Sequence, residues 1–150
     1  MSQANHVNHG LSPESVAGFL LRLALGVLFL FAAIGKFAGP GPMGFATWIL
    51  QEFEATYLPR FLVVPYAYAL PYVEFLLGVV LILGVFTKVS LTLAALTLIS
   101  LAFGKMVQQD HATVANNFNY VFMAAVALWF SWRDNILSLD RLFWHKKRET

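Results

Sequence analysis

Apolar residues gather in four blocks that are each long enough to cross a bilayer as a helix. The predicted spans cover residues 13–37, 66–86, 89–107 and 116–132. Ser12 followed by Pro13 is typical of an N-cap and a first helical residue. This pattern predicts an all-α integral membrane protein, a bundle of four transmembrane helices.

Residues 43–58, between the first two spans, have a different pattern. Apolar residues at helical spacing are Ala46, Ile49, Leu50, Phe53 and Tyr57, and polar residues lie between them. We expect a short amphipathic helix at the membrane surface, stopped by Pro59. An irregular lid packed on the bundle is the alternative.

Composition and charge agree with a membrane location. Hydrophobic residues make up 59% of the 150-residue chain and charged residues 12%, against about 25% charged in a soluble domain. Basic residues gather near the C-terminus, at Arg133, Arg141, Lys146, Lys147 and Arg148. The positive-inside rule therefore predicts a multi-pass inner (plasma) membrane protein with both termini in the cytoplasm. Nothing indicates nucleic-acid binding.

Three regions are expected along the chain. Residues 1–12 form a flexible cytoplasmic tail, 13–142 the membrane domain, and 143–150 a basic cytoplasmic tail in contact with membrane lipid. Since no Lys or Arg precedes Arg22 and the first apolar block is long enough to span, we expect a retained first helix and no cleaved signal peptide.

The chain has no cysteine, which removes disulfides, thiol nucleophiles and thiolate-bound clusters. Quinone or flavin chemistry would need a cofactor held by oxygen, nitrogen and aromatic groups. His6 and His9 have helical ligand spacing but no third ligand, so we expect no metal site.

Glu74, inside the second span, is the leading candidate for chemistry. A carboxylate in hydrocarbon is costly, so one that is kept is by default a functional candidate. Lys36 and Lys105 are expected near the same level, about 8–9 Å away along the helix axis, and either could keep Glu74 ionised. Alternatively Glu74 stays protonated, because burial disfavours the charged form, and donates to a quinone carbonyl or relays a proton. A structural ion pair without a ligand competes with both.

An outward-facing polar pocket is predicted around Glu74. Pro71 frees the carbonyl of Ala67 and kinks the span, which is tolerated where backbone lines a cavity. Tyr72, Asn119 and Tyr120 are the further ligand-binding candidates.

Arg22 lies nearer the inner surface, about 13 Å below Glu74. We expect its side chain to reach the inner headgroups. A structural ion pair between Arg22 and Glu74 is the alternative, if the two spans are shifted relative to these boundaries. Arg22 and Gly26 also share their spacing with Glu74 and Gly78, a weak sign of an inverted repeat.

Several short motifs resemble the DoxX-like membrane family, which includes the DoxD/DoxX subunits of thiosulfate:quinone oxidoreductase. These motifs are Arg22 with Gly26, Gly35-Lys36, Glu74 with Gly78, Leu83-Gly84, Thr87-Lys88 and Leu137-Ser138-Leu139-Asp140. The resemblance covers residues 17–142. It implies a four-helix membrane fold and, for some members, a role in quinone-linked oxidation of sulfur compounds. The family residues that carry over are Arg22, Lys36 and Glu74.

Three functions remain open from the sequence. The first is a membrane subunit that supports a quinone-linked redox system, with Glu74 as the catalytic proton or hydrogen-bond partner and quinone as the candidate cofactor. The second is a non-enzymatic chaperone or scaffold for a partner protein. The third is a small-molecule permease, which would need a homo-oligomer.

Overall fold

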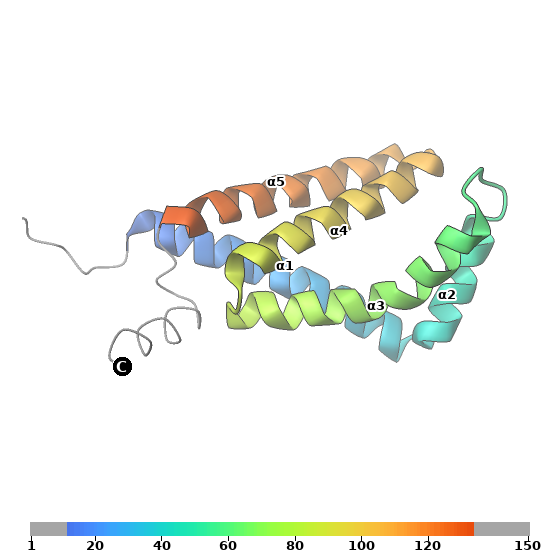
Figure 1. Ribbon diagram of the computed structural model, residues 1–150, viewed down its shortest axis with the longest axis horizontal. Coiled ribbons are helices and arrows are strands. Elements are labelled where there is room, and N and C mark those ends of the chain that lie inside the picture. The colour runs from blue at the N-terminus through green and yellow to red at the C-terminus, as the bar shows by residue number, and fades with distance from the viewer. Residues whose placement is uncertain (1–11, 134–150) are drawn as a thin grey trace, which may run out of the picture.

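The computed structural model describes residues 12–133, which fold into α-helices and contain no strand (Figure 1). The helices are α1 (Pro13–Ala38), α2 (Gly41–Glu52), α3 (Arg60–Leu83), α4 (Thr87–Val107) and α5 (His111–Arg133). The predicted basic segment 143–150 and the predicted tail up to residue 11 lie outside the described residues.

Three of these helices are long and apolar enough to cross a membrane: α1, α3 and α4. With 23 residues α5 is long enough, but it carries His111, Asn116, Asn117 and Asn119 in its first half and is not among the three. The all-helical membrane class is therefore confirmed, whereas a four-span bundle is not.

Most of the predicted helix boundaries hold. The Ser12 hydroxyl accepts the Ser15 amide N–H at 3.2 Å, so the predicted N-cap of α1 is confirmed. A helix also forms between the first two spans, but α2 ends at Glu52 and does not continue to Pro59. Two starts were predicted too late, since α3 begins at Arg60, not at 66, and α5 begins at His111, not at 116.

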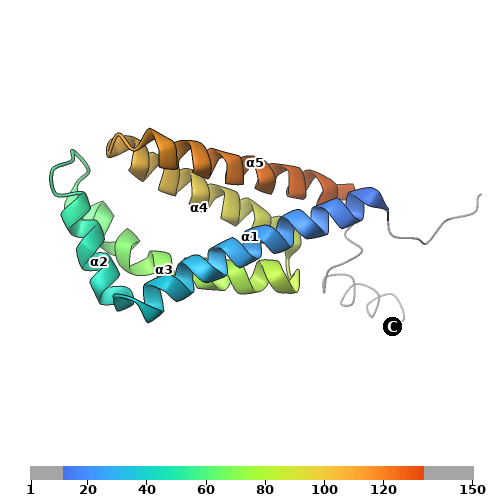
Figure 2. The same cartoon turned by 180° about the vertical axis from the view of Figure 1, so that it is seen from behind.

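The long helices run antiparallel, with α1 packed on α3 and α5, and α4 packed on α5 (Figures 1 and 2). Between α3 and α4 contacts are sparse, because the two helices diverge from the turn that joins them (Figure 1). α2 packs mainly on α3, at the far end of the bundle from that turn.

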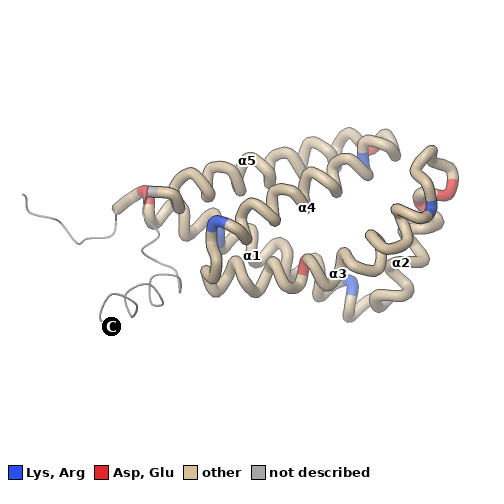
Figure 3. Tube along the Cα trace, viewed as in Figure 1, with Lys and Arg blue, Asp and Glu red and all other residues tan. Residues whose placement is uncertain are grey.

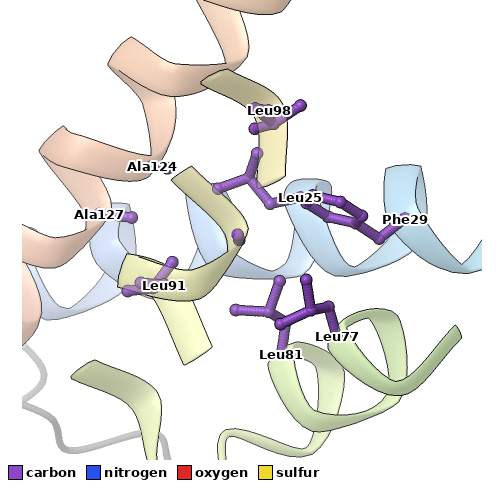
Figure 4. Packing of buried hydrophobic residues seen from close by; sticks show 9 residues of the cluster. Leu25, Phe29, Leu77, Leu81, Leu91, Leu98, Ala124 and Ala127 are labelled. Atoms are coloured by element: carbon purple, nitrogen blue, oxygen red, sulfur yellow. The ribbon is translucent and has the colours of Figure 1, made fainter. Parts of the chain in front are cut away.

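A cluster of leucine, phenylalanine and alanine side chains forms the core between α1, α3, α4 and α5 (Figure 4). The backbones of α1 and α3 approach closely at Gly26 and Gly78. A Cβ built on Gly78 would lie 2.6 Å from the backbone nitrogen of Leu30, and one built on Gly26 would lie 3.2 Å from the carbonyl oxygen of Gly78. Only glycine lets the two helices approach this closely.

Charged residues lie mostly at the two ends of the bundle, and the middle of each helix is almost free of charge (Figure 3). Glu74 is an exception, because it is a charged residue in the middle of α3. The candidate site therefore lies around it.

Candidate functional site

A buried ion pair joins the end of α1 to the middle of α3. Nζ of Lys36 lies 2.6 Å from Oε2 of Glu74. The Glu74 side chain is 4% exposed and that of Lys36 is 19% exposed. Lys36 stands in the last turn of α1, one side-chain length from Glu74, because the Gly26–Gly78 contact sets the register of the antiparallel pair.

The Lys36 ammonium has two further partners. It donates to the carbonyl oxygen of Ala32 at 3.3 Å, and it lies 5.1 Å from the centre of the Phe45 ring on α2. A cation over an aromatic face is attracted by the ring quadrupole. The single lysine therefore connects α1, α2 and α3.

Lys105, the other candidate partner of Glu74, lies elsewhere. Its Nζ contacts the side-chain oxygen of Gln108 at 2.6 Å and Oδ2 of Asp110 at 3.9 Å, at the turn between α4 and α5. The sequence could not separate the two lysines by depth alone. The divergence of α3 and α4 separates them, since Lys105 stands in the last turn of α4.

The other ligand-binding candidates are not gathered around Glu74. Tyr72 is 57% exposed, and its ring meets Phe37 edge-on at 5.3 Å on the outer surface. Asn119 is exposed and Tyr120 packs against the core cluster, on a helix that makes little contact with α3. The buried asparagine of α5 is Asn117, which was not among the predicted site residues.

Of the two predictions for Arg22, the ion pair with Glu74 is wrong. The Arg22 residue is only 3% exposed. It donates from Nη1 to Oγ1 of Thr87 at 3.4 Å and lies against Gly84, in the turn between α3 and α4. Gly84 follows Glu74 by ten residues, about 15 Å of helix, so the guanidinium cannot pair with Glu74.

Pro71 is buried within an unbroken α3, together with Ala67. The half of α3 that contains Pro65 and Pro71 changes direction in the ribbon (Figure 1). α3 therefore continues through both prolines and is bent, which is a common effect of proline in a helix.

A cavity of about 540 Å³ lies away from the ion pair, at the corner between α2 and α3. Neither Lys36 nor Glu74 lines it. Its lining residues come from the end of α2, the connection 53–59 and the first turn of α3: Thr47, Leu50, Gln51, Phe53, Glu54, Leu58, Arg60 and Val63. Glu54 and Arg60 were not among the predicted site residues, although their opposite charges on either side of Pro59 were the available signal.

Among the described residues, no group of three or more His, Asp or Glu side chains could hold a metal ion. The ion pair can hold α1, α2 and α3 together, and the cavity can hold a small ligand.

The sequence model of the methylamine utilisation protein MauE matches residues 14–115, well over half of the chain. The chain belongs to the MauE family. Searches of curated proteins and of solved structures returned no match.

The resemblance to DoxX is therefore wrong, since the matching family is MauE, a different membrane family. The motifs that suggested DoxX are small residues within spans and basic residues at their ends. Membrane helices in general share these features, because glycine allows close packing and lysine reaches the interface.

The MauE match contains α1 to α4 and the first residues of α5. It thus includes all three helices that are long and apolar enough to span, as well as Lys36, Glu74 and the cavity.

Proposed function

We propose that this MauE-family protein serves methylamine utilisation as a non-enzymatic membrane scaffold for a partner protein, and that the Lys36–Glu74 pair maintains its fold. The proposal is supported by the family match and by the three spanning-length helices. Use of methylamine depends on oxidative chemistry, and a membrane subunit can support such a system without carrying out a redox step itself.

The ion pair is the observation that carries the scaffold proposal. Glu74 is buried and its charge is met directly by Lys36, which also contacts Ala32 and Phe45. An acid already paired in this way ties helices together. Removing one partner from a buried pair leaves an uncompensated charge and costs about 3–5 kcal/mol.

A charge exchange tests this role. Lys36→Glu and Glu74→Lys should each lower the folded yield in membranes sharply, and the double variant should recover much of it, because a pair forms again. Growth of the native organism on methylamine, with the chromosomal copy replaced by each variant, should follow the folded yield.

A chemical role for the carboxyl gives a different result. If the double variant folds but does not support growth on methylamine, position 74 needs a carboxyl for a reason other than stability, and the scaffold proposal fails. Glu14→Gln, an exposed change in the first turn of α1, is the matched control and should leave both measurements unchanged.

Quinone binding at the ion pair is the second candidate. The Lys36 side chain is partly exposed. Phe37, the next residue in the chain, meets the rings of Tyr72 and Phe75 edge-on, with centres 5.3 and 6.1 Å from its own. A quinone ring could pack among these aromatics and accept a hydrogen bond from the ammonium. Binding of a ubiquinone analogue to reconstituted protein should then weaken in Lys36→Met, which removes the ammonium. Equal binding in the two proteins would remove this candidate.

We also propose that α5 crosses the membrane as a fourth span, so that both termini lie in the cytoplasm. Its 23 residues extend about 34 Å, and it packs along α4 and α1, two helices of spanning length. The absence of cysteine makes the test direct. Single cysteines at Ser2 and at Thr150 should react with an impermeant thiol reagent from the same side of the membrane, and a cysteine at Gln109 from the opposite side. Reaction of Ser2→Cys and Thr150→Cys from opposite sides would contradict a fourth span.

A further inference from the structure

The cavity between α2 and α3 has opposite charges on its walls. Glu54 follows the end of α2, and Arg60 begins α3. Both line the cavity, yet the structure places no ion pair between them among the described residues. Both are also exposed, so each charge is available to a ligand.

The two helix ends add to this separation of charge. The last turn of α2 lines the cavity and carries no basic residue, so the negative end of its dipole is not compensated there. The first turn of α3 carries no acidic residue and no side-chain cap, so its positive end is likewise uncompensated. One wall thus attracts a cation and the other an anion.

The other lining residues are mixed. Leu50, Phe53, Leu58 and Val63 are apolar, and Thr47 and Gln51 are polar. Arg60 is the first residue of a helix that is long and apolar enough to span, so we infer that the cavity lies near the level where the bilayer meets water. Tyr57 and Phe61 flank Arg60 in the sequence and are exposed, and exposed Tyr66 and Tyr68 follow in the first half of α3. Aromatic residues of this kind are enriched at membrane interfaces.

We propose that this cavity binds a zwitterionic aminophospholipid, with the primary ammonium of the headgroup on Glu54, the phosphate on Arg60 and the start of α3, and the glycerol and upper acyl chains on the apolar residues. A volume of about 540 Å³ is within the roughly 300–1,000 Å³ of small-molecule sites. A primary ammonium donates hydrogen bonds to a carboxylate, which a trimethylammonium group cannot do.

Native mass spectrometry of the full chain, with defined lipids added in detergent, tests the proposal. Phosphatidylethanolamine should bind at least about tenfold more tightly than phosphatidylcholine or phosphatidylglycerol, the difference expected from one charge-assisted hydrogen bond. Glu54→Gln should remove the preference for phosphatidylethanolamine over phosphatidylglycerol. Arg60→Gln should weaken the binding of both lipids.

Glu52→Gln is the matched control, since Glu52 is an exposed acid two residues from Glu54 that does not line the cavity. It should leave all three lipid affinities unchanged. Because Glu54, Arg60 and Glu52 are exposed, thermal unfolding in detergent should show that each variant folds. An equal loss of affinity in Glu52→Gln and Glu54→Gln would indicate general surface charge and overturn the proposal.

Two soluble molecules that carry the same charged groups test whether the cavity binds a lipid or a small soluble ligand. Phosphoethanolamine should bind at least about tenfold more weakly than the lipid, because it lacks the apolar part, and equal affinity would overturn a lipid site. Methylammonium should not displace the lipid. Displacement by methylammonium that does not depend on Arg60 would make the cavity an amine site instead.

Discussion

The guanidinium of Arg22 occupies the space that a side chain at position 84 would need. A Cβ built on Gly84 would lie 2.7 Å from Cζ of Arg22, and Gly84 has a φ of +67°. Position 84 therefore requires glycine both for its backbone conformation and for the arginine packed against it. The turn between α3 and α4 and the buried Arg22 depend on each other.

Gly84→Ala should lower the free energy of unfolding clearly. The left-handed conformation alone costs a non-glycine residue about 1–2 kcal/mol, and displacement of Arg22 from Thr87 adds to this. Unfolding in mixed detergent micelles measures the change. Gly35→Ala is the control, because nothing lies within 4 Å of its Cβ position and alanine favours the helix by roughly 0.5–1 kcal/mol. Equal stability of the two variants would refute the role of Arg22 at this turn.

Gly78→Ala should also destabilise the protein, for a different reason. Its backbone is an ordinary helix, but the new Cβ would lie 2.6 Å from the nitrogen and 2.8 Å from Cα of Leu30. Backbone cannot move aside as a flexible side chain can, so α1 and α3 must separate, at a cost of about 1–3 kcal/mol. The same unfolding assay measures the loss. A variant as stable as Gly35→Ala would show that the two helices are not in close contact at this level.

Hydrogen bonding between Tyr66 and Ser100 links α3 to α4 where the two helices diverge. The two hydroxyl oxygens lie 2.8 Å apart. Tyr66→Phe and Ser100→Ala should each cost only about 0.6 kcal/mol, the average for such bonds within membranes, and the double variant should cost little more than either. Tyr68→Phe, at an exposed tyrosine of the same helix, should cost nothing. Full additivity of the two changes in the unfolding assay would indicate that the bond does not form.

The features of the fold that could be predicted are those determined by residues close together in the sequence. The start of α1 was correct because Ser12 and Pro13 determine it without help from the rest of the chain. The start of α3 was predicted at 66, because Pro59 was expected to end the preceding helix and the second span was assigned only from Tyr66 onward. Pro59 lies just before the helix as its N-cap, and Pro65 removes only one backbone hydrogen bond near its beginning.

The candidate site was harder to predict, because it depends on which helices touch. The sequence predicts Lys36 and Lys105 at similar depths in the membrane, so it could not show which of them pairs with Glu74. The pairing of α1 with α3 brings Lys36 to the carboxylate, whereas α4 leads Lys105 away. Depth also placed Arg22 among the headgroups. The space that holds it exists only because a distant residue, Gly84, has no side chain.

Asp110 makes one end of α5 sensitive to pH. Its carboxylate accepts hydrogen bonds from the hydroxyl of Thr113 at 2.7 Å and from the amide of Thr113 at 3.1 Å. These bonds favour the charged form and hold the pKa of Asp110 below its usual range. A lowered pKa in the folded state means that the stabilisation is present above about pH 3.9, the pKa of an unperturbed Asp, and is lost as the pH falls through the lower folded value.

The protection factor of the Thr113 amide in hydrogen exchange should therefore fall as the pH is lowered below about 3.9, while amides in the middle of α5 keep theirs. Asp110→Asn is the matched control, because asparagine also caps helices but does not titrate in this range. In that variant the protection factor of Thr113 should not change over the same acid interval. A parallel fall in both proteins would mean that the loss of protection comes from another acidic group and not from the cap of α5.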